Sequence, residues 1–214
     1  MPDDVDVKFI SDFRKMINLF PKMKFVVVCG GGVTARKYIR AIEKFGASTK
    51  EQSLVGIDMT RFHAEFLARI FGAEANPPEN LPMNMKKVKR LLRRNRVVFC
   101  GALRWADDKT SDGTASELAS YLKCPFINLT NVDGLYDKNP KKYKGAKKIS
   151  RITWRKFNAI AQKIKFHAGQ NFVLDQDAAE TIMKNRVSTY IVGGLSEMKK
   201  IIEGKSFSGT IIEG

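Results

Sequence analysis

The most constraining feature of the sequence is a β-prone run that ends in glycine and precedes a helical pattern. Phe25–Cys29 has the composition of a buried strand, and Gly30–Gly32 follows it directly. Apolar residues then recur at helical spacing from Thr34 to Phe45. This order of strand, glycine loop and helix points backbone N–H groups at a phosphate. The glycines are also compatible with a tight turn that binds nothing.

The same alternation of strand and helix continues along the chain. Further strands are predicted at 96–101, 125–129 and 188–194, and helical patterns at 5–19, 57–71, 110–123, 153–166, 177–184 and 196–203. Strands that alternate with helices indicate a parallel sheet covered on both faces. The sequence therefore predicts an α/β fold, a three-layer α/β/α sandwich with a mostly parallel central sheet. No repeat or low-complexity linker divides it, so we expect a single domain over residues 1–214.

Composition excludes several classes of protein. No apolar run approaches the ~20 residues of a membrane span, and Met1–Asp6 lacks the basic and apolar regions of a signal peptide. Cys29, Cys100 and Cys124 share no CxxC spacing and border apolar runs. They are predicted to be small buried thiols in a reducing compartment rather than metal ligands. We therefore expect a cytoplasmic protein.

The net charge of +16 indicates a polyanionic partner or an unusual milieu. Basic residues gather at 86–96 and 138–156, but aromatic stacking residues do not alternate with them, and no helix-turn-helix or RNA-recognition signature is present. The pattern at 85–94 places Val88, Leu91 and Leu92 on one face of a helix, which makes its charges the solvated side. These observations favour nucleotides over nucleic acid as the anionic partner.

Residues 130–140 form the most informative segment. They leave the end of the predicted strand at 125–129, Asp133-Gly134 is a turn dipeptide, and Pro140 prevents a simple continuation into helix or strand. In open α/β sheets, such loops at strand ends bind ligands. An ordinary β-hairpin is the alternative.

The order Thr-Asn-Val-Asp-Gly-Leu-Tyr from Thr130 to Tyr136, with Pro140 beyond it, resembles the nucleotide-binding loop of the amino acid kinase family. Within that family the likeness is to the archaeal type of UMP kinase. Five further stretches resemble the same family in the same order, so the likeness covers nearly the whole chain. It implies ATP contacts at Thr130, Asn131, Tyr136 and Asn139, and Asn139 stands where the family usually has aspartate.

Gly30–Tyr38 resembles the family's GGG-x-x-A-R-K-Y segment, which lies between donor and acceptor nucleotides. The resemblance implies that Gly31 binds UMP and that Gly32 and Arg36 bind the ATP phosphates, with Arg36 as the catalytic residue. A guanidinium in the first turns of that helix can form bidentate, charge-assisted hydrogen bonds with a phosphate.

Thr110-Ser111-Asp112 resembles the family's Thr-Thr-Asp at a helix start, which implies contacts with UMP. Hydroxyls and free helix N–H groups make an anion site there, although simple helix capping is the alternative. Gly56–Arg61 resembles the family's G-I-x-x-T-R, which lines the acceptor site and the subunit interface.

The sequence departs from the family at two places near the acceptor. Ser53 replaces an aspartate that binds ribose hydroxyls, and a serine cannot grip two hydroxyls as a carboxylate does. The segment 102–109 is longer than its counterpart and lacks its Pro-Gly-His. Ser53 is therefore expected to bind the UMP ribose weakly, or the acceptor differs.

The resemblance as a whole implies a nucleoside monophosphate kinase of pyrimidine nucleotide biosynthesis, which converts ATP and UMP to ADP and UDP. It further implies Mg²⁺ bound mainly through the nucleotide phosphates, and a homo-oligomer, a hexamer built from dimers. Three alternatives stay open: a family phosphotransferase with another acceptor, a non-catalytic nucleotide-binding or regulatory homologue, and a basic RNA-binding protein.

The beginning of the sequence also differs from the resembled family. Its members open with a strand that ends in Gly-Gly-Ser, and Met1–Asp6 resembles the stretch directly after that strand. We therefore expect this chain to lack the family's first strand.

Overall fold

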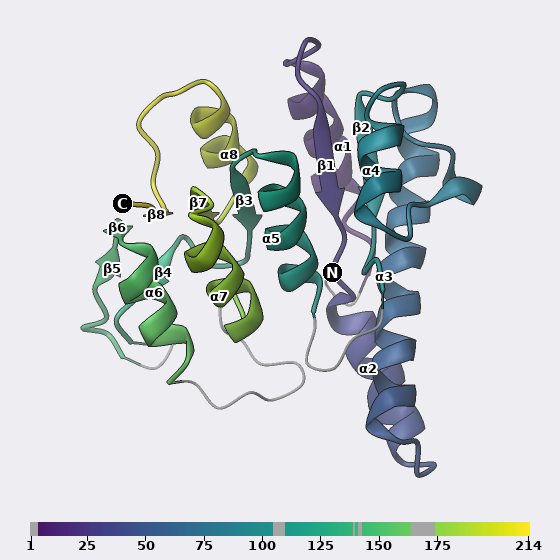
Figure 1. Ribbon diagram of the computed structural model, residues 1–214, viewed down its shortest axis with the longest axis horizontal. Coiled ribbons are helices and arrows are strands. Elements are labelled where there is room, and N and C mark those ends of the chain that lie inside the picture. Colours follow the sequence, from purple (N-terminus) through teal and green to yellow (C-terminus); the bar gives the residue numbers. More distant parts are fainter. Residues whose placement is uncertain (1–3, 105–109, 139, 141–142, 164–173) are drawn as a thin grey trace. The chain divides into compact units, whose positions relative to one another are not determined.

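The computed structural model describes residues 4–104, 110–138, 140, 143–163 and 174–214 (Figure 1). The chain forms two compact units, residues 1–114 and residues 115–214. Helix α5 (Ser111–Leu122) begins in the first unit and ends in the second. The single domain expected over residues 1–214 stays a prediction.

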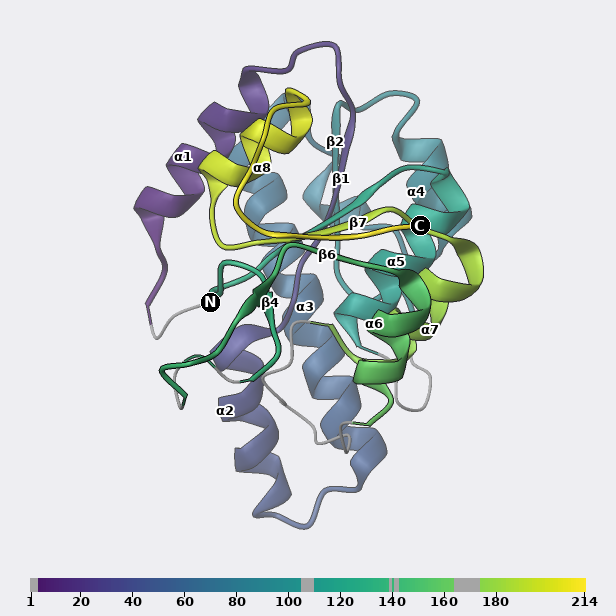
Figure 2. The same ribbon diagram turned by 90° about the vertical axis from the view of Figure 1, so that its left-hand side faces the viewer.

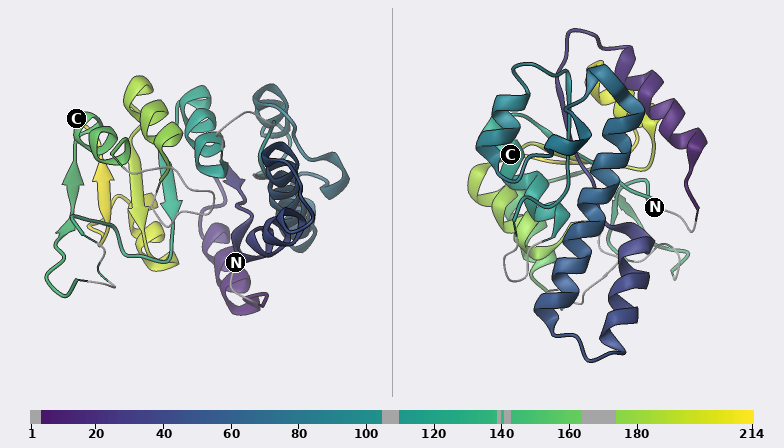
Figure 3. Two further views of the ribbon diagram at one scale, coloured as in Figure 1. Left: turned by 90° about the horizontal axis from the view of Figure 1, so that it is seen from below. Right: turned by 90° about the vertical axis from the view of Figure 1, so that its right-hand side faces the viewer.

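The first unit is built from helices around two parallel strands. Its elements are α1 (Val7–Asn18), β1 (Phe25–Val28), α2 (Gly32–Glu43), α3 (Thr49–Phe71), α4 (Met85–Leu91), β2 (Val97–Cys100) and two 3-10 turns, Gly72–Glu74 and Pro78–Asn80. Strand β1 pairs with β2 in parallel, with Phe25 opposite Val97 and Val28 opposite Cys100. Figure 3 shows α2 and α3 side by side as a helical hairpin. A parallel strand pair beside this hairpin is the frame of the first unit.

Helix α3 begins eight residues before the predicted start at Ile57. Ser48 caps it, accepting a hydrogen bond from the Glu51 backbone, while the Glu51 side chain accepts one from the Ser48 backbone. This capping box explains the early start, because it satisfies two backbone donors that the helix leaves unpaired. At the other end of α3, Phe71 is buried edge-on against Phe99 of β2, with ring centroids 4.8 Å apart.

The second unit contains a four-stranded sheet. Its remaining elements are β3 (Phe126–Leu129), β4 (Leu135–Tyr136), β5 (Lys148–Ile149), β6 (Arg151–Ile152), α6 (Trp154–Ala161), α7 (Gln176–Asn185), β7 (Thr189–Val192), α8 (Leu195–Ile202) and β8 (Thr210–Ile212). Four strands form one sheet in the order β3-β7-β8-β6. The pairs β3–β7 and β6–β8 are parallel, β7–β8 is antiparallel, and β4 and β5 form a separate antiparallel pair.

Helices cover both faces of this four-stranded sheet. Helices α6 and α7 lie on one side of the strands and α8 on the other (Figures 2 and 3). Phe157, Leu174, Ile182 and Ile191 are fully buried in the core of the unit. The predicted α/β class, with mostly parallel pairing and a three-layer α/β/α arrangement, is confirmed. No helix in the described part of the chain is long and apolar enough to cross a membrane.

Candidate functional site

Two glycine segments leave the same edge of the strand pair in the first unit. Gly30–Gly32 follows β1 and Gly101 follows β2. The parallel register extends past the strands, because the Cys29 backbone donates to the carbonyl of Cys100 at 2.8 Å. Carboxyl ends of parallel strands are where α/β folds bind ligands.

The residues around these segments leave no room for a side chain at Gly31 or at Gly101. A Cβ on Gly31 would lie 2.5 Å from the Ala35 Cβ and 3.5 Å from the Gly56 carbonyl oxygen. A Cβ on Gly101 would lie 2.5 Å from the Thr60 hydroxyl and 2.6 Å from the Arg61 backbone nitrogen. Glycine is therefore required at both positions, because Ala35 of α2 fills the space beside Gly31 and the backbone of α3 approaches Gly101.

Two buried polar side chains of α3 fix both loops. The Thr60 hydroxyl donates to the Ile57 carbonyl at 2.7 Å and accepts from the Ala102 backbone at 2.9 Å. His63 Nδ1 donates to the Gly30 carbonyl at 2.8 Å, and this acceptor places the proton on Nδ1. His63 was not identified from the sequence; its only signal is its position three residues after Thr60, which places both on one helix face.

Thr110 caps the start of α5, which is the alternative role that the sequence left open for it. The Thr110 hydroxyl accepts from the backbones of Asp112 at 3.1 Å and Gly113 at 3.4 Å. Ser111 lies beside the glycine loop, because a Cβ on Gly30 would lie 3.4 Å from the Ser111 hydroxyl. The structure thus brings Ser111, at a helix start, to the loop that follows β1.

Arg36 and Ser53 flank the same loop on the helical hairpin. Arg36 is exposed, one turn beyond Gly32 on α2, and forms no ion pair with any residue that the structure describes. Ser53 is exposed on α3, one turn before Gly56, or about 4.5 Å along the helix axis. Gly31, whose Cβ position faces Gly56, lies close to that turn.

In the second unit, residues 130–136 form the predicted loop at the carboxyl ends of β3 and β7. The Thr130 backbone donates to the Val192 carbonyl at 2.9 Å, which extends the β3–β7 pairing by one residue. Gly134 has a φ of +144°, and a Cβ there would lie 2.9 Å from the Thr210 hydroxyl. That hydroxyl accepts from the Leu135 backbone at 2.7 Å and donates to the Ile149 carbonyl at 2.6 Å. The loop is therefore held against β8 through one threonine.

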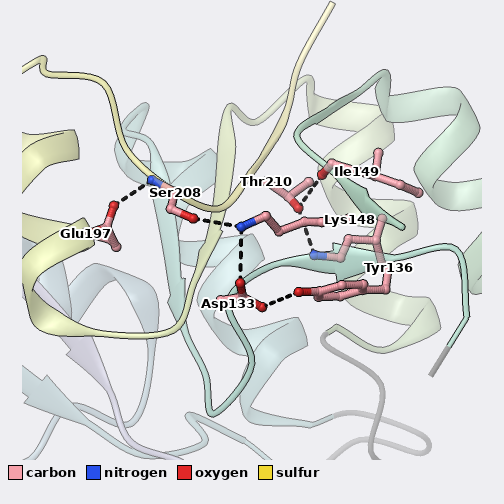
Figure 4. A network of polar contacts seen from close by, with 8 residues as sticks. Asp133, Tyr136, Lys148, Ile149, Glu197, Ser208 and Thr210 are labelled. Atoms are coloured by element: carbon pink, nitrogen blue, oxygen red, sulfur yellow. Dashed lines mark hydrogen bonds and ion pairs between the residues drawn. The ribbon is translucent and has the colours of Figure 1, made fainter. Parts of the chain in front are cut away.

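A network of polar contacts holds the side chains of this loop (Figure 4). Asp133 accepts from the Tyr136 hydroxyl at 2.7 Å and from Lys148 Nζ at 3.1 Å. Lys148 also donates to the Ser208 hydroxyl at 2.7 Å, and the Ser208 backbone donates to Glu197. The hydrogen bond from Tyr136, followed by that from Lys148, lowers the pKa of Asp133, and Asp133 in turn raises the pKa of Tyr136.

The predicted ATP contacts have different surroundings. Thr130 and Tyr136 are half-buried and Asn131 is exposed. Asn139 and residues 105–109 lie outside the described residues, whereas Ala102 and Leu103 of the divergent segment are buried.

Lys148, which orients Asp133, was not singled out from the sequence, because it is one of nine basic residues between Lys138 and Lys156.

We expect the Asp133 contacts to depend on pH. A carboxyl group whose folded pKa is lowered stabilises the fold above its unfolded pKa and loses that contribution as the pH falls through the folded pKa. Asp133→Asn should therefore lower the thermal midpoint at neutral pH, and the difference from wild type should vanish in acid. Calorimetry between about pH 3 and pH 7, a range that spans the ordinary aspartate pKa, measures this.

Tyr136→Phe is the matched control, because it removes one donor to Asp133 and keeps Lys148. It should give a smaller difference with the same direction of pH dependence. A gap between Asp133→Asn and wild type that stays constant over the whole range would show that the ionised carboxylate does not hold the loop.

Comparison with known proteins extends over both units. The sequence matches the amino acid kinase family over residues 3–193. It is 33% identical over 217 residues to the uridylate kinase of Thermococcus kodakarensis, an alignment that covers 100% of this chain and 94% of that protein. It is 34% identical over 206 residues to the uridylate kinase of Archaeoglobus fulgidus, covering 95% and 91%.

Solved structures give the same result. The crystal structure of uridylate kinase from Archaeoglobus fulgidus has a TM-score of 0.85 at 31% identity, covering 97% of this chain and 93% of that one. The UMP kinase of Bacillus anthracis has a TM-score of 0.75, covering 100% and 89%, and at 17% identity it shows the shared fold alone.

Proposed function

The chain belongs to the amino acid kinase family, and we propose on this basis that it is a uridylate kinase that transfers the γ-phosphoryl group of ATP to UMP. The observation that carries the proposal is the glycine loop after β1. Ala35 of α2 excludes a side chain at Gly31, α3 excludes one at Gly101, and α2 begins at Gly32. A bare loop at a helix N-terminus presents backbone N–H groups to phosphate. The relatives that match the chain over 95–100% of its length are named uridylate kinases.

We assign the acceptor to the first unit. Gly31 would bind the UMP phosphate through its backbone, with Ser111 at the start of α5 beside it. Thr110 would act by capping that helix, and Asp112 would orient the phosphate-binding groups. Ser53, one turn before Gly56, would face the ribose.

We assign the adenine nucleotide mainly to the loop of the second unit. Thr130, Asn131, Tyr136 and Asn139 would bind ATP there, and the Asp133–Lys148 contacts hold Tyr136 in one orientation. Gly32 and Arg36 of the first unit would bind the ATP phosphates. An exposed guanidinium without an ion-pair partner among the described residues is available for such a contact.

The reaction needs little covalent chemistry from the protein. A phosphate oxygen of UMP attacks the γ-phosphorus, and the bond from that phosphorus to the oxygen of ADP breaks. The attacking oxygen is ionised at neutral pH, so no general base is required. Arg36 stabilises the charge on the transferring group, and the glycine loop positions the acceptor.

Magnesium fits this site as an ion carried by the nucleotides. Within the described residues, no three His, Cys, Asp or Glu side chains come together as metal ligands. Mg²⁺ commonly takes its ligands from substrate phosphates and water with few carboxylates. Bound in this way, it would neutralise phosphate charge during the transfer.

The test is ADP release in a coupled assay with a panel of acceptors. UMP should give the highest kcat/KM among UMP, CMP, AMP, GMP and glutamate, with UDP as the product on chromatography. A higher kcat/KM for another acceptor would show that the chain is an amino acid kinase family phosphotransferase that acts on that acceptor instead of UMP. Ser53 and the divergent 102–109 segment favour this second candidate. No acceptor-dependent ADP release would refute the kinase proposal.

Ser53→Asp should strengthen UMP binding by roughly 1–2 kcal/mol, because a carboxylate can accept from two ribose hydroxyls. Calorimetric titration with UMP measures the change. Leu54→Asp is the control: it adds the same charge at the neighbouring exposed position, on another part of the helix surface. If Ser53→Asp weakens binding as Leu54→Asp does, the ribose is not at this position.

We further propose a cytoplasmic homo-oligomer, a hexamer built from dimers. Apolar side chains exposed on α1 and α3 support self-association, with Phe9 41% and Phe62 58% exposed. Free cysteines at 29, 100 and 124 support a reducing compartment. Light scattering after gel filtration gives the mass, and a monomer at micromolar concentration would contradict the assembly.

A further inference from the structure

The second unit contains a cavity at the other end of the strands that carry the nucleotide loop. It has a volume of about 470 Å³ and lies where α5 and α7 end and β3 and β7 begin. Phe126 pairs with Thr189, so the amino ends of the two parallel strands meet there. Figures 1 and 3 show α5 and α7 side by side. The volume falls within the range of small-molecule sites.

Two basic residues with left-handed backbones line this cavity. Lys123, which follows α5, has a φ of +55°, and Arg186, which ends α7, has a φ of +52°. This conformation is unfavourable for non-glycine residues, and glycine is the usual residue at such helix ends. Two positions that favour glycine therefore carry cations, and both face one cavity. Such strain is a sign of function where an observed geometry supports it.

The rest of the lining suits an anion. Among the residues that the structure describes, no carboxylate lines the cavity and none forms an ion pair with either cation. Ser120, Asn185 and Ser188 add hydroxyl and amide groups. Cations near helix C-termini also interact favourably with the helix dipole. That interaction explains a positive charge at each helix end, but it does not require a cavity shared by the two cations.

We propose that this cavity binds a small phosphate monoester, at a site separate from the one proposed for catalysis. Two positive charges match the two negative charges of such a group at neutral pH. Arg186 can bind its oxygens in a bidentate manner, and Lys123 acts as a point charge. The hydroxyls of Ser120 and Ser188 can donate further hydrogen bonds. The cavity exceeds the size of a phosphate, which leaves room for an organic group.

Cys124 reports on this site without any kinase assay. It lines the cavity and is exposed, so the prediction of a buried thiol is wrong for Cys124, whereas Cys29 and Cys100 are buried as predicted. Cys124 is alkylated with iodoacetamide in solutions of inorganic phosphate, acetate or chloride at equal ionic strength. The rate of alkylation is measured from the mass of the peptide that contains Cys124. At a phosphate concentration ten times its Kd, the fraction of protein with an empty cavity should fall about tenfold, and the rate of Cys124 alkylation should fall with it. Acetate should protect far less. Equal rates in all three salts would overturn the proposal.

The double variant Lys123→Gly, Arg186→Gly is the matched test. It removes both charges and supplies the residue that prefers this backbone, so its thermal midpoint should be unchanged or raised. Phosphate should no longer protect Cys124, while kinase activity is kept. Undiminished protection in the variant would overturn the role of the cations. If the glycine pair unfolds, the pair Lys123→Gln, Arg186→Gln answers the same question.

Discussion

Replacing Arg36 by alanine is expected to reduce turnover by about 10²–10⁴-fold, because it removes a charge that stabilises the transferring phosphoryl group. The side chain is exposed on α2 and forms no ion pair within the described residues, so its loss should leave stability unchanged. The effect should fall mainly on kcat, since the interaction is strongest when the phosphoryl group moves. The coupled assay with ATP and UMP measures both kcat and KM.

Two further substitutions test whether the effect belongs to this guanidinium. Arg36→Lys keeps the charge and loses the bidentate geometry, so its turnover should lie between those of wild type and Arg36→Ala. Arg40→Ala removes the same group one turn further along α2, where the side chain is also exposed, and should leave turnover near normal. Near-normal kinetics for Arg36→Ala would remove this residue from the mechanism.

The alternation of strands and helices was predictable because it depends on local pattern. The family predicted from residues 130–140 and its companion stretches is confirmed by the match over residues 3–193. The first turns of α3 were missed because residues 49–56 carry little apolar periodicity, and Ser53 and Leu54 are exposed. The Ser48–Glu51 capping box was the signal for that start, and it acts on backbone donors rather than through hydrophobic spacing.

The contacts that hold the site were less predictable, because they join residues distant in the sequence. His63 bonds to Gly30 across 33 residues, and Lys148 reaches Ser208 across 60. Neither partner is marked by local spacing, since a buried histidine and one lysine in a basic run occur for many reasons. Thr60 lay inside a recognised motif, yet its bridge to Ala102 follows only from the packing of α3 on the β2 loop.

That packing makes Gly101 the residue whose change should affect the fold of the first unit most. A Cβ there would lie 2.5 Å from the Thr60 hydroxyl, 2.6 Å from the Thr60 carbonyl carbon and 2.6 Å from the Arg61 nitrogen. Two of these atoms are backbone, so α3 or the loop must shift. Overpacking of this kind costs about 1–3 kcal/mol or more, and we expect Gly101→Ala to lower the free energy of unfolding by about 3 kcal/mol.

Urea denaturation followed by circular dichroism measures this loss. Gly145→Ala is the control, because no atom of the described residues lies within 4 Å of its Cβ position, and it should be nearly neutral. Adding Thr60→Ala to Gly101→Ala removes the hydroxyl clash together with the hydrogen bond from Ala102, and it leaves both backbone contacts, so stability should not recover. Recovery in that double variant would place the conflict in the side chain alone. A Gly101→Ala protein as stable as Gly145→Ala would show that α3 does not approach the β2 loop this closely.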